Sequence, residues 1–413
     1  MSASVRKLTI IYHNAGGGHR SAAEALKSML TALDQPWEVV LLDIQELLSP
    51  LDLMRRATGF RIQDTYNLIL RRGWTRFTPE LLKVLQAAIF VYHRPIVKAL
   101  RAYWAEHPSE IVLSVIPHFN RQIAESVRQQ LPGSKFITLL TDFADYPPHF
   151  WIEKESEYLI VGTERARQQA LAMGHASSHI FQASGMILKP KFHQQTAVDR
   201  IGQRKGLGLD ADCPTAIVMF GGHGARVMVD IAKKIDQSDV DVQLILICGH
   251  NQKLAAELTA LRTDKPKLVV GFASNVEYYM GLADFFIGKP GPGSISEALQ
   301  CHLPVIVECN SKTMPQERYN AQWVSERGYG IVLKSFREIA HAVEKLTEGD
   351  TLNEFRQRVN QYSNRALSDV IQILESCQQS STTEALFVPE AKPIIAYGSA
   401  LPPSFSSAKS LSK

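Results

Sequence analysis

The sequence predicts an α/β fold in which two doubly wound, parallel-sheet domains face a cleft and a long C-terminal helical segment follows. Three observations lead to this prediction. Short apolar runs alternate with helical patterns in both halves of the chain, which is typical of parallel sheets covered by helices. A polar stretch, residues 189–206, separates the two halves. Glycine-rich turns follow several of the apolar runs, at the position where ligands of such sheets bind.

The first half contains short apolar runs that we expect to form parallel strands. Between them lie helical patterns at residues 21–33, 120–131 and 164–173. Parallel strands are buried on both faces, so they are continuous apolar runs rather than alternating ones. The expected strands are residues 8–12, 39–42, 111–116, 136–140, 158–161 and 180–182.

The second half repeats this alternation of elements without repeating the sequence. Its expected strands are residues 216–220, 243–248, 268–270, 284–287, 305–307 and 331–333. A long helical pattern occupies residues 351–376, and the Ser- and Pro-rich remainder lacks periodicity, so we expect it to be disordered. We therefore divide the chain into a domain of residues 1–188, a linker of residues 189–206, a domain of residues 207–376 with the final helices, and a disordered tail of residues 377–413.

Composition limits the classes of protein that remain. The 413 residues, 45% of them hydrophobic, suffice for two cores. No run approaches the ~20 apolar residues that span a bilayer, and the first residues, which include Arg6 and Lys7, do not resemble a signal peptide. The five scattered cysteines indicate reduced cytosolic thiols and no metal site. A net charge of +4 gives weak support for nucleic-acid binding, and we expect none.

The stretch from Gly288 to Leu299 combines a strand end, a glycine-rich turn and a helix start. Ser294 and Glu297 fit a capping box, which predicts that the helix begins at Ser294. Bare backbone N–H groups at a helix start suit a phosphate, because the free donors and the helix dipole both favour negative charge. The alternative is a tight turn that needs its glycines for geometry alone.

A second glycine-rich turn follows the first expected strand and leads into His19. Gly16, Gly17 and Gly18 let a ligand or another backbone approach closely. His19 would then stand at the mouth of this loop, on the ligand side. A histidine near a helix start is also often an ordinary surface residue, and the glycine run favours the functional interpretation.

The segment between Arg55 and Arg101 differs from the rest of the chain in charge. It holds ten Lys and Arg residues against two acids, a local charge of +8, while the remainder sums to −4. Aromatic residues lie between the basic ones, as in segments that bind an anionic membrane surface. A helical subdomain with a solvated basic face is the alternative. The residues expected to meet the membrane are Arg71, Arg72, Trp74, Arg76 and Phe77.

In order and spacing, the motifs of this chain resemble those of the monogalactosyldiacylglycerol synthase family, which are GT-B glycosyltransferases that use nucleotide sugars. The resemblance runs over most of residues 8–375. Its most specific parts are residues 289–298 and 316–320 at their mutual spacing. Further matching parts are residues 16–20, 141–142, 149, 184–186, 220–222, 248–249 and 271–272. The resemblance implies a GT-B fold with two Rossmann-like domains.

The resemblance also implies roles for individual residues. The second domain would bind a UDP-sugar, with Glu317 accepting two hydrogen bonds from the ribose hydroxyls and with Gln316 and Asn320 at the sugar. His19 would take the proton of the acceptor hydroxyl as general base. Asp142 would either orient His19 or the acceptor, or cap the loop that follows it. The other expected donor-binding residues are Gly221, Gly222, Phe272, Gly291, Pro292, Gly293, Ser294 and Ile295, and His149 joins Gly16, Gly17 and Gly18 on the acceptor side.

These features predict an inverting, metal-independent glycosyltransferase that moves a hexose, galactose before glucose, from a UDP-sugar co-substrate to a lipid hydroxyl, with diacylglycerol as the expected acceptor. It would need no cofactor and would attach peripherally to the cytoplasmic face of a membrane. One alternative is a UDP-sugar epimerase or hydrolase on the same fold, which would have no use for the basic aromatic segment. The other is a nonenzymatic lipid- or nucleotide-binding protein, and the joint presence of His19 and Glu317 argues against it.

Overall fold

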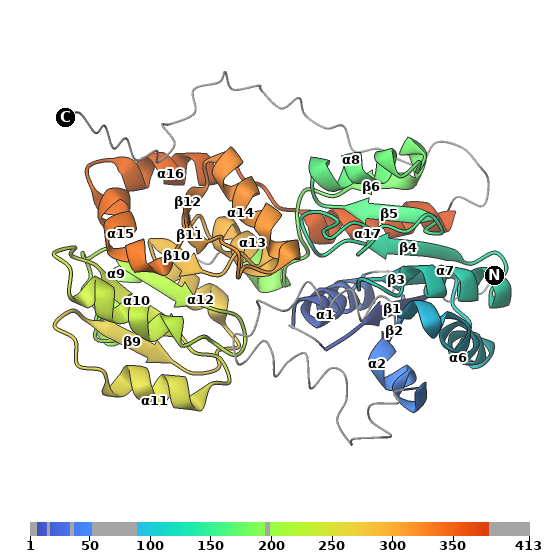
Figure 1. Ribbon diagram of the computed structural model, residues 1–413, viewed down its shortest axis with the longest axis horizontal. Coiled ribbons are helices and arrows are strands. Elements are labelled where there is room, and N and C mark those ends of the chain that lie inside the picture. Colours follow the sequence, from blue (N-terminus) through green and yellow to red (C-terminus); the bar gives the residue numbers. More distant parts are fainter. Residues whose placement is uncertain (1–5, 15–16, 34–36, 52–88, 195–198, 380–413) are drawn as a thin grey trace, which may run out of the picture.

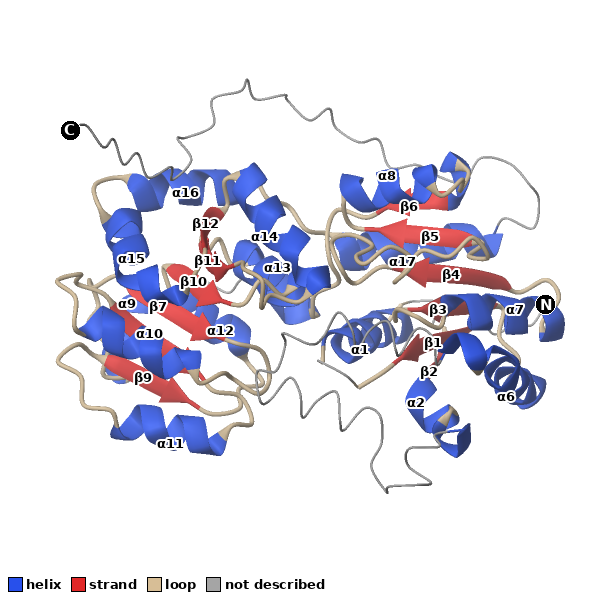
Figure 2. Cartoon of the chain, viewed as in Figure 1, coloured by secondary structure: helices blue, strands red, loops and turns tan. Residues whose placement is uncertain are grey.

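The computed structural model describes residues 6–14, 17–33, 37–51, 89–194 and 199–379. The chain forms two halves side by side, each built on one six-stranded parallel sheet with helices packed on it (Figures 1 and 2). Every expected strand forms, and the bounds differ from the expected ones by no more than two residues. The predicted α/β class with two doubly wound sheets is therefore confirmed.

The first sheet has the strand order β2-β1-β3-β4-β5-β6, with all neighbours parallel. The chain turns to one side of β1 to form β2 and to the other side to form β3. The carboxyl ends of β1 and β3 therefore flank a topological switch point, where sheets of this kind bind ligands. The strands are β1 (Lys7–Tyr12), β2 (Glu38–Asp43), β3 (Ile111–Ser114), β4 (Lys135–Leu139), β5 (Tyr158–Val161) and β6 (Ile180–Gln182).

Helices cover both faces of the first sheet. On one face α1 (Gly18–Thr31) buries Leu26 and Leu30 in a core that includes Ile10 of β1. On the other face α6 (His93–Glu106) and α7 (Asn120–Gln130) share a core with β3 and β4, in which Trp104 is fully buried. Further described elements of this half are α2 (Ile44–Leu47), η1 (Ser49–Leu51), α8 (Glu164–Ala172) and η3 (Ser177–His179).

The second sheet has the strand order β12-β11-β10-β7-β8-β9, also parallel throughout. Its switch point lies between β10 and β7, so the loops that follow these two strands are neighbours. The strands are β7 (Thr215–Met219), β8 (Gln243–Ile247), β9 (Lys267–Val270), β10 (Phe285–Gly288), β11 (Val305–Glu308) and β12 (Gly330–Leu333). The helices are α10 (Val227–Asp236), α11 (Gln252–Ala260), α12 (Val276–Leu282), α13 (Pro292–Gln300), α14 (Pro315–Arg327), η5 (Phe336–Glu338), α15 (Ile339–Thr347) and α16 (Thr351–Val359).

Residues 189–206, predicted to be a linker, contain η4 (Pro190–His193) and α9 (Arg200–Gly206). The guanidinium of Arg204 is buried and donates to the carboxylate of Asp284 over 2.6 Å and to the carbonyl of Leu282 over 2.7 Å. These bonds tie α9 to the residues just before β10. The linker prediction is therefore wrong for this helix, because a buried Arg–Asp contact cannot be read from polar composition.

The helix expected over residues 351–376 is interrupted, and its second part, α17 (Ala366–Gln379), belongs to the first half. Asn364 breaks the pattern: it accepts from the N–H of Ala366 over 3.0 Å and donates to the carbonyl of Met186 over 2.8 Å. The chain thus returns to the first half next to Met186, close to the end of β6, where it left the first sheet. α17, red in Figure 1, packs Val370 and Leu374 in the same core as Leu26 of α1.

The assignment of the final helix to the second domain is therefore wrong. The helical spacing of its apolar residues identifies an amphipathic helix but not the sheet that the helix covers. The other domain boundaries stay a prediction, and most of the expected disordered tail lies outside the described residues.

Candidate active site

The side chain of His19 lies at the switch point of the first sheet. Gly17, with φ at +79°, turns the chain out of the loop after β1 so that α1 can begin. Nδ1 of His19 is 2.8 Å from the carbonyl oxygen of Val115, just past β3, and 3.0 Å from Oγ1 of Thr141, just past β4. Because a carbonyl oxygen can only accept, Nδ1 carries the proton, and the lone pair of the neutral ring is on Nε2.

The surroundings of His19 keep its ring uncharged. Burial lowers the pKa of His19 to about 4, and the hydrogen bond to Val115 opposes this shift only in part. The ring of His13 lies 4.3 Å away between centroids, and that of Trp151 lies 5.7 Å away. At neutral pH the side chain is therefore a neutral imidazole with a fixed tautomer, as a general base requires.

Asp142 supports this arrangement indirectly. Its carboxylate accepts a hydrogen bond of 2.8 Å from Nε1 of Trp151, the buried side chain that faces the His19 ring. The hydrogen-bond partners of Nδ1 of His19 are Val115 and Thr141, and Asp142 acts on the ring through Trp151. That Asp142 orients His19 or the acceptor stays a prediction.

Burial raises the pKa of Asp142 to about 7, and the hydrogen bond from Trp151 opposes the rise. Glu317 raises this pKa further, whereas Lys289 lowers it. Both of these residues belong to the second half. Rings also meet across the two halves: Phe143 lies 4.6 Å from Trp323, and Tyr146 lies 5.9 Å from Tyr319. The carboxyl edges of the two sheets therefore face each other at this point.

The loop after Asp142 is held by Asp145, which the sequence did not single out. Its buried carboxylate accepts from the backbone N–H groups of His149, Phe150 and Trp151 over 2.6–3.0 Å. His149 is exposed and has φ at +62°, a conformation that costs energy for a side chain other than glycine. In the sequence this loop is marked by an aspartate, Asp145, that precedes the aromatic residues 149–151 by four to six positions.

The glycine-rich loops of the second half are packed against one another at the ends of β7 and β8. Gly221 has φ at +72°, and a side chain at Gly249 would collide with the carbonyl of Gly222. The N–H of His250 donates to that carbonyl over 2.9 Å. The predicted pair Gly221–Gly222 thus lies at the carboxyl edge of the second sheet, in loops with little conformational freedom.

Phe272, which follows β9, is 62% exposed although it is large and apolar. One face of its ring stacks on His250 at 4.2 Å with an interplanar angle of 18°. The stacked pair holds the phenyl ring in a fixed orientation. An exposed ring of this kind can stack on a planar ligand such as a nucleobase.

The phosphate-type loop between β10 and α13 begins its helix earlier than predicted. Gly291 is the N-cap, and Pro292 is the first helical residue, so the expected capping box at Ser294 is wrong. Proline is favoured at this position because its φ suits a helix and it has no N–H to leave unpaired. No side chain caps the helix and no acid lies in its first turn, and a side chain at Gly293 would meet nothing within 4 Å. The side chain of Ile295 lies in the core, and its N–H donates to the carbonyl of Gly291 over 3.0 Å.

α14 brings Gln316 and Glu317 to the same edge of the sheet. Glu317 is buried, and its carboxylate makes a 2.6 Å ion pair with the ammonium group of Lys289. Gln316 is also buried, and its carbonyl oxygen has no hydrogen-bond partner among the described residues. At this edge of the sheet the unpaired oxygen can accept a hydrogen bond from a ligand. Lys289 was missed, although a lysine directly before the phosphate-type loop is a visible signal.

Asn320 is fully buried, and its amide nitrogen donates to the carbonyl of Pro290 over 2.8 Å, which supports the loop before α13. Its carbonyl oxygen, like that of Gln316, has no hydrogen-bond partner among the described residues. The expected contact of Asn320 with the sugar stays a prediction.

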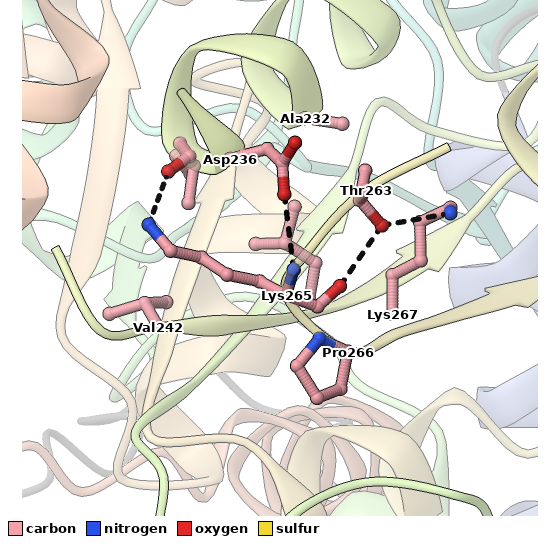
Figure 3. A pocket seen from close by; sticks show the side chains of 9 residues that line it. Ala232, Asp236, Val242, Thr263, Lys265, Pro266 and Lys267 are labelled. Carbon is pink, nitrogen blue, oxygen red and sulfur yellow. Dashed lines mark hydrogen bonds between the residues drawn. The ribbon is translucent and has the colours of Figure 1, made fainter. Parts of the chain in front are cut away.

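Two cavities lie away from this edge. The first, of about 10 Å³, lies between the start of β9 and α10 and is large enough for about one water (Figure 3). The second, of about 310 Å³, adjoins the start of α6 and is lined by Phe90, Val91, His93, Arg94, Pro95 and Arg121. Phe90 and Val91 are 71% and 74% exposed. The predicted membrane-facing residues 71–77 and the loop residue Gly16 lie outside the described residues.

Among the described residues, three or more His, Cys, Asp or Glu side chains do not come together in a group that could hold a metal ion. Within the same ranges, no helix has both the length and the apolar composition that crossing a membrane requires.

Comparison with known proteins gives matches along most of the chain. The family model "Monogalactosyldiacylglycerol (MGDG) synthase" matches residues 19–185, and "Glycosyltransferase family 28 C-terminal domain" matches residues 215–373. Monogalactosyldiacylglycerol synthase 2 of Arabidopsis thaliana is 28% identical over 351 residues, which cover 82% of this chain and 73% of that protein. The probable monogalactosyldiacylglycerol synthase 2 of Oryza sativa subsp. japonica is 28% identical over 404 residues, 92% of this chain and 83% of that protein.

Among solved structures, MurG of Acinetobacter baumannii has a similar fold. The TM-score is 0.59, with 11% sequence identity over 90% of this chain and 99% of that one. At this identity the likeness concerns the fold alone, which is the GT-B arrangement of two doubly wound halves.

Proposed function

We infer that the chain belongs to the monogalactosyldiacylglycerol synthase family, and on that premise we propose that it transfers a hexose, galactose first, from a UDP-sugar to the free hydroxyl of diacylglycerol. The observation that carries the proposal is the neutral His19, which offers the lone pair of Nε2 at the edge where the two halves face each other.

The first step of the mechanism is activation of the acceptor. Nε2 of His19 takes the proton of the lipid hydroxyl as the hydroxyl oxygen attacks the anomeric carbon. The protonated ring is then a cation whose Nδ1–H still donates to the carbonyl of Val115. Trp151, held by Asp142, keeps the ring in the orientation that the transfer needs. Attack opposite to the leaving group inverts the anomeric carbon.

The second half binds the donor. The uracil lies on the exposed ring of Phe272, and the ribose hydroxyls donate to Glu317, whose carboxylate can accept two hydrogen bonds at once. The diphosphate lies at the uncapped start of α13, beside Gly291, Gly293 and Ser294. Backbone donors that are already in place stabilise the negative charge of the leaving group without reorganisation.

The lipid acceptor requires the enzyme to work at a membrane surface, and we propose that it attaches peripherally, on the cytoplasmic side. Phe90 and Val91 are exposed apolar residues next to Arg94, and they continue the basic aromatic segment that contains residues 71–77. Apolar insertion together with basic residues is the physical basis of attachment to anionic membranes. The five cysteines are free, as is usual in a reducing compartment.

The experiment that tests this function offers UDP-galactose, UDP-glucose and UDP-N-acetylglucosamine to the protein, each with and without diacylglycerol. Mass spectrometry of the lipid fraction should show a monohexosyl diacylglycerol, most of it from UDP-galactose. Free sugar in the absence of a lipid product would identify a hydrolase, and a changed donor sugar would identify an epimerase.

A further inference from the structure

Lys289 occupies the centre of the donor edge. It follows β10 at the switch point of the second sheet, and its ammonium group is 2.6 Å from Oε1 of Glu317. The side chain of Lys289 is 41% exposed and that of Glu317 is 8% exposed, so the lysine covers the carboxylate from the solvent side. While this ion pair is intact, Lys289 occupies Oε1, one of the two oxygens with which Glu317 would accept the pair of ribose hydroxyls.

Glycines surround the end of the lysine side chain. A side-chain carbon at Gly221 would lie 3.7 Å from Cε of Lys289, and one at Gly291 would lie 3.5 Å from the same atom. The ammonium group is thus bordered by two bare backbone segments, one from each side of the switch point. The uncapped start of α13, without an acid in its first turn, adjoins the second of them. The ammonium group of Lys289 therefore lies next to open space at the start of α13, as binding of an anion requires.

The charge balance of this edge changes when a nucleoside diphosphate enters. Without ligand, the ammonium group of Lys289 balances the buried carboxylate of Glu317. The ligand adds negative phosphate oxygens at the α13 start and adds ribose hydroxyls, which need an acceptor. The ammonium group of Lys289 can then pair with either of two anions, the carboxylate of Glu317 or the diphosphate, and the diphosphate carries more negative charge.

We propose that Lys289 exchanges partners when the donor binds: its ammonium group leaves Glu317 for the diphosphate, and the freed carboxylate accepts the ribose hydroxyls. This inference rests on the proposed function, because it takes a UDP-sugar as the ligand. The ion pair of the empty site keeps the buried carboxylate compensated until the ribose replaces the lysine.

The same lysine takes part in the transfer step. The acceptor oxygen forms a bond to the anomeric carbon while the bond from that carbon to the diphosphate oxygen breaks. The bonding electron pair leaves with the diphosphate, and the hydroxyl proton passes to His19. Lys289 keeps its protons and neutralises the negative charge that grows on the leaving oxygen, at the moment when that charge is largest.

The alternative is that the Lys289–Glu317 pair only stabilises the fold. The two interpretations differ in what the phosphates contribute to binding. In a partner exchange, Lys289 acts on the diphosphate and affects UDP far more than uridine. A purely structural pair would affect both ligands alike, since each would meet the same disturbed site.

Calorimetry with UDP and with uridine separates the two interpretations. Lys289→Met should weaken UDP binding roughly 10- to 100-fold, because a charge-assisted hydrogen bond is lost, and should not weaken uridine binding, because the carboxylate of Glu317 is then free for the ribose hydroxyls. Lys289→Arg should retain most of the UDP affinity. In Glu317→Gln both ligands should bind more weakly, but the ratio of the uridine to the UDP dissociation constant should rise, because Lys289 no longer has to leave a charged partner.

Lys233→Met is the matched control. Lys233 is an exposed lysine in the last turn of α10, at the opposite end of the sheet from the donor loops. Its loss should leave both dissociation constants unchanged, which shows that removal of an arbitrary positive charge is not enough.

An unchanged ratio of the two dissociation constants in Lys289→Met, with normal UDP binding by the wild type, would overturn the exchange and leave the proposed function standing. Absence of UDP binding by the wild type would overturn both. Should Lys289→Met fail to fold, the ratio in Glu317→Gln decides: a rise supports the exchange, and a ratio equal to that of the wild type overturns it.

Discussion

Replacing His19 by alanine removes the group that we place as general base. In the structure this change deletes the Nδ1 hydrogen bonds to Val115 and Thr141. Each such bond contributes about 0.5–1.5 kcal/mol to stability, so the variant should fold, with a modest loss in unfolding temperature. The loss of rate should be much larger, roughly 10²–10⁴-fold or about 3–5 kcal/mol in the barrier, because a proton acceptor acts in the transition state.

The assay measures initial rates of galactose transfer from labelled UDP-galactose to diacylglycerol, together with UDP binding by calorimetry. UDP binding should stay unchanged in His19→Ala, since the donor-binding residues lie in the other half. His341→Ala, a change of an exposed histidine on α15, should transfer at the wild-type rate. A folded His19→Ala variant that keeps most of the wild-type rate would refute the role of His19 as base.

Three further predictions follow from the same geometry. Glu317→Ala should weaken UDP binding by roughly 1.5–3 kcal/mol, because a hydrogen bond to a charged group is lost; an unchanged dissociation constant in calorimetry would mean that another residue binds the ribose. Burial lowers the pKa of His19 to about 4, so a magnetic-resonance titration of its ring should show protonation only as the pH falls towards that value, and a midpoint at the ordinary 6.5 would contradict the site. Changing Arg71, Arg72 and Arg76 together to Ser should weaken the binding free energy to anionic liposomes by about 1 kcal/mol per residue, measured by co-sedimentation, and undiminished binding would identify a solvated basic face.

The strands could be predicted from the sequence because both faces of a parallel sheet are buried. Runs such as Leu8–Tyr12 and Tyr158–Val161 are mostly apolar on both faces and only four or five residues long, which favours a buried strand. The place proposed for the site also comes from the sequence, since parallel strands bring their carboxyl ends, and the loops after them, to one edge. His19 and the loop at Gly291 were proposed as site residues in this way, and the structure places both at such edges.

The helix ends were less predictable, because competing signals lie side by side. Pro292 and Ser294 can each start a helix, and the structure uses the proline. The destination of α17 depends on the sheet that its apolar face covers, which the spacing of Val370 and Leu374 does not encode. α9 is fixed by the contact of Arg204 with Asp284, two residues that are distant in the sequence.

The same limitation applies to the site. The partners of His19 are Val115 and Thr141, about a hundred positions away along the chain, so the fixed tautomer could not be deduced from the motif at Gly16–Arg20. The ion pair of Lys289 with Glu317 also joins two separate motifs. Residue types therefore indicated the chemistry, while the pairing of the side chains required the fold.

The measurement that tests the central claim most directly is the structure of the lipid product formed from UDP-galactose and diacylglycerol. Our account predicts a monogalactosyl diacylglycerol whose anomeric configuration, read from the proton coupling constant, is inverted relative to the donor. It also predicts that this product still forms in the presence of EDTA, because Lys289 and the start of α13 face the diphosphate. A retained configuration, or transfer that stops with EDTA and resumes with magnesium or manganese, would contradict the account.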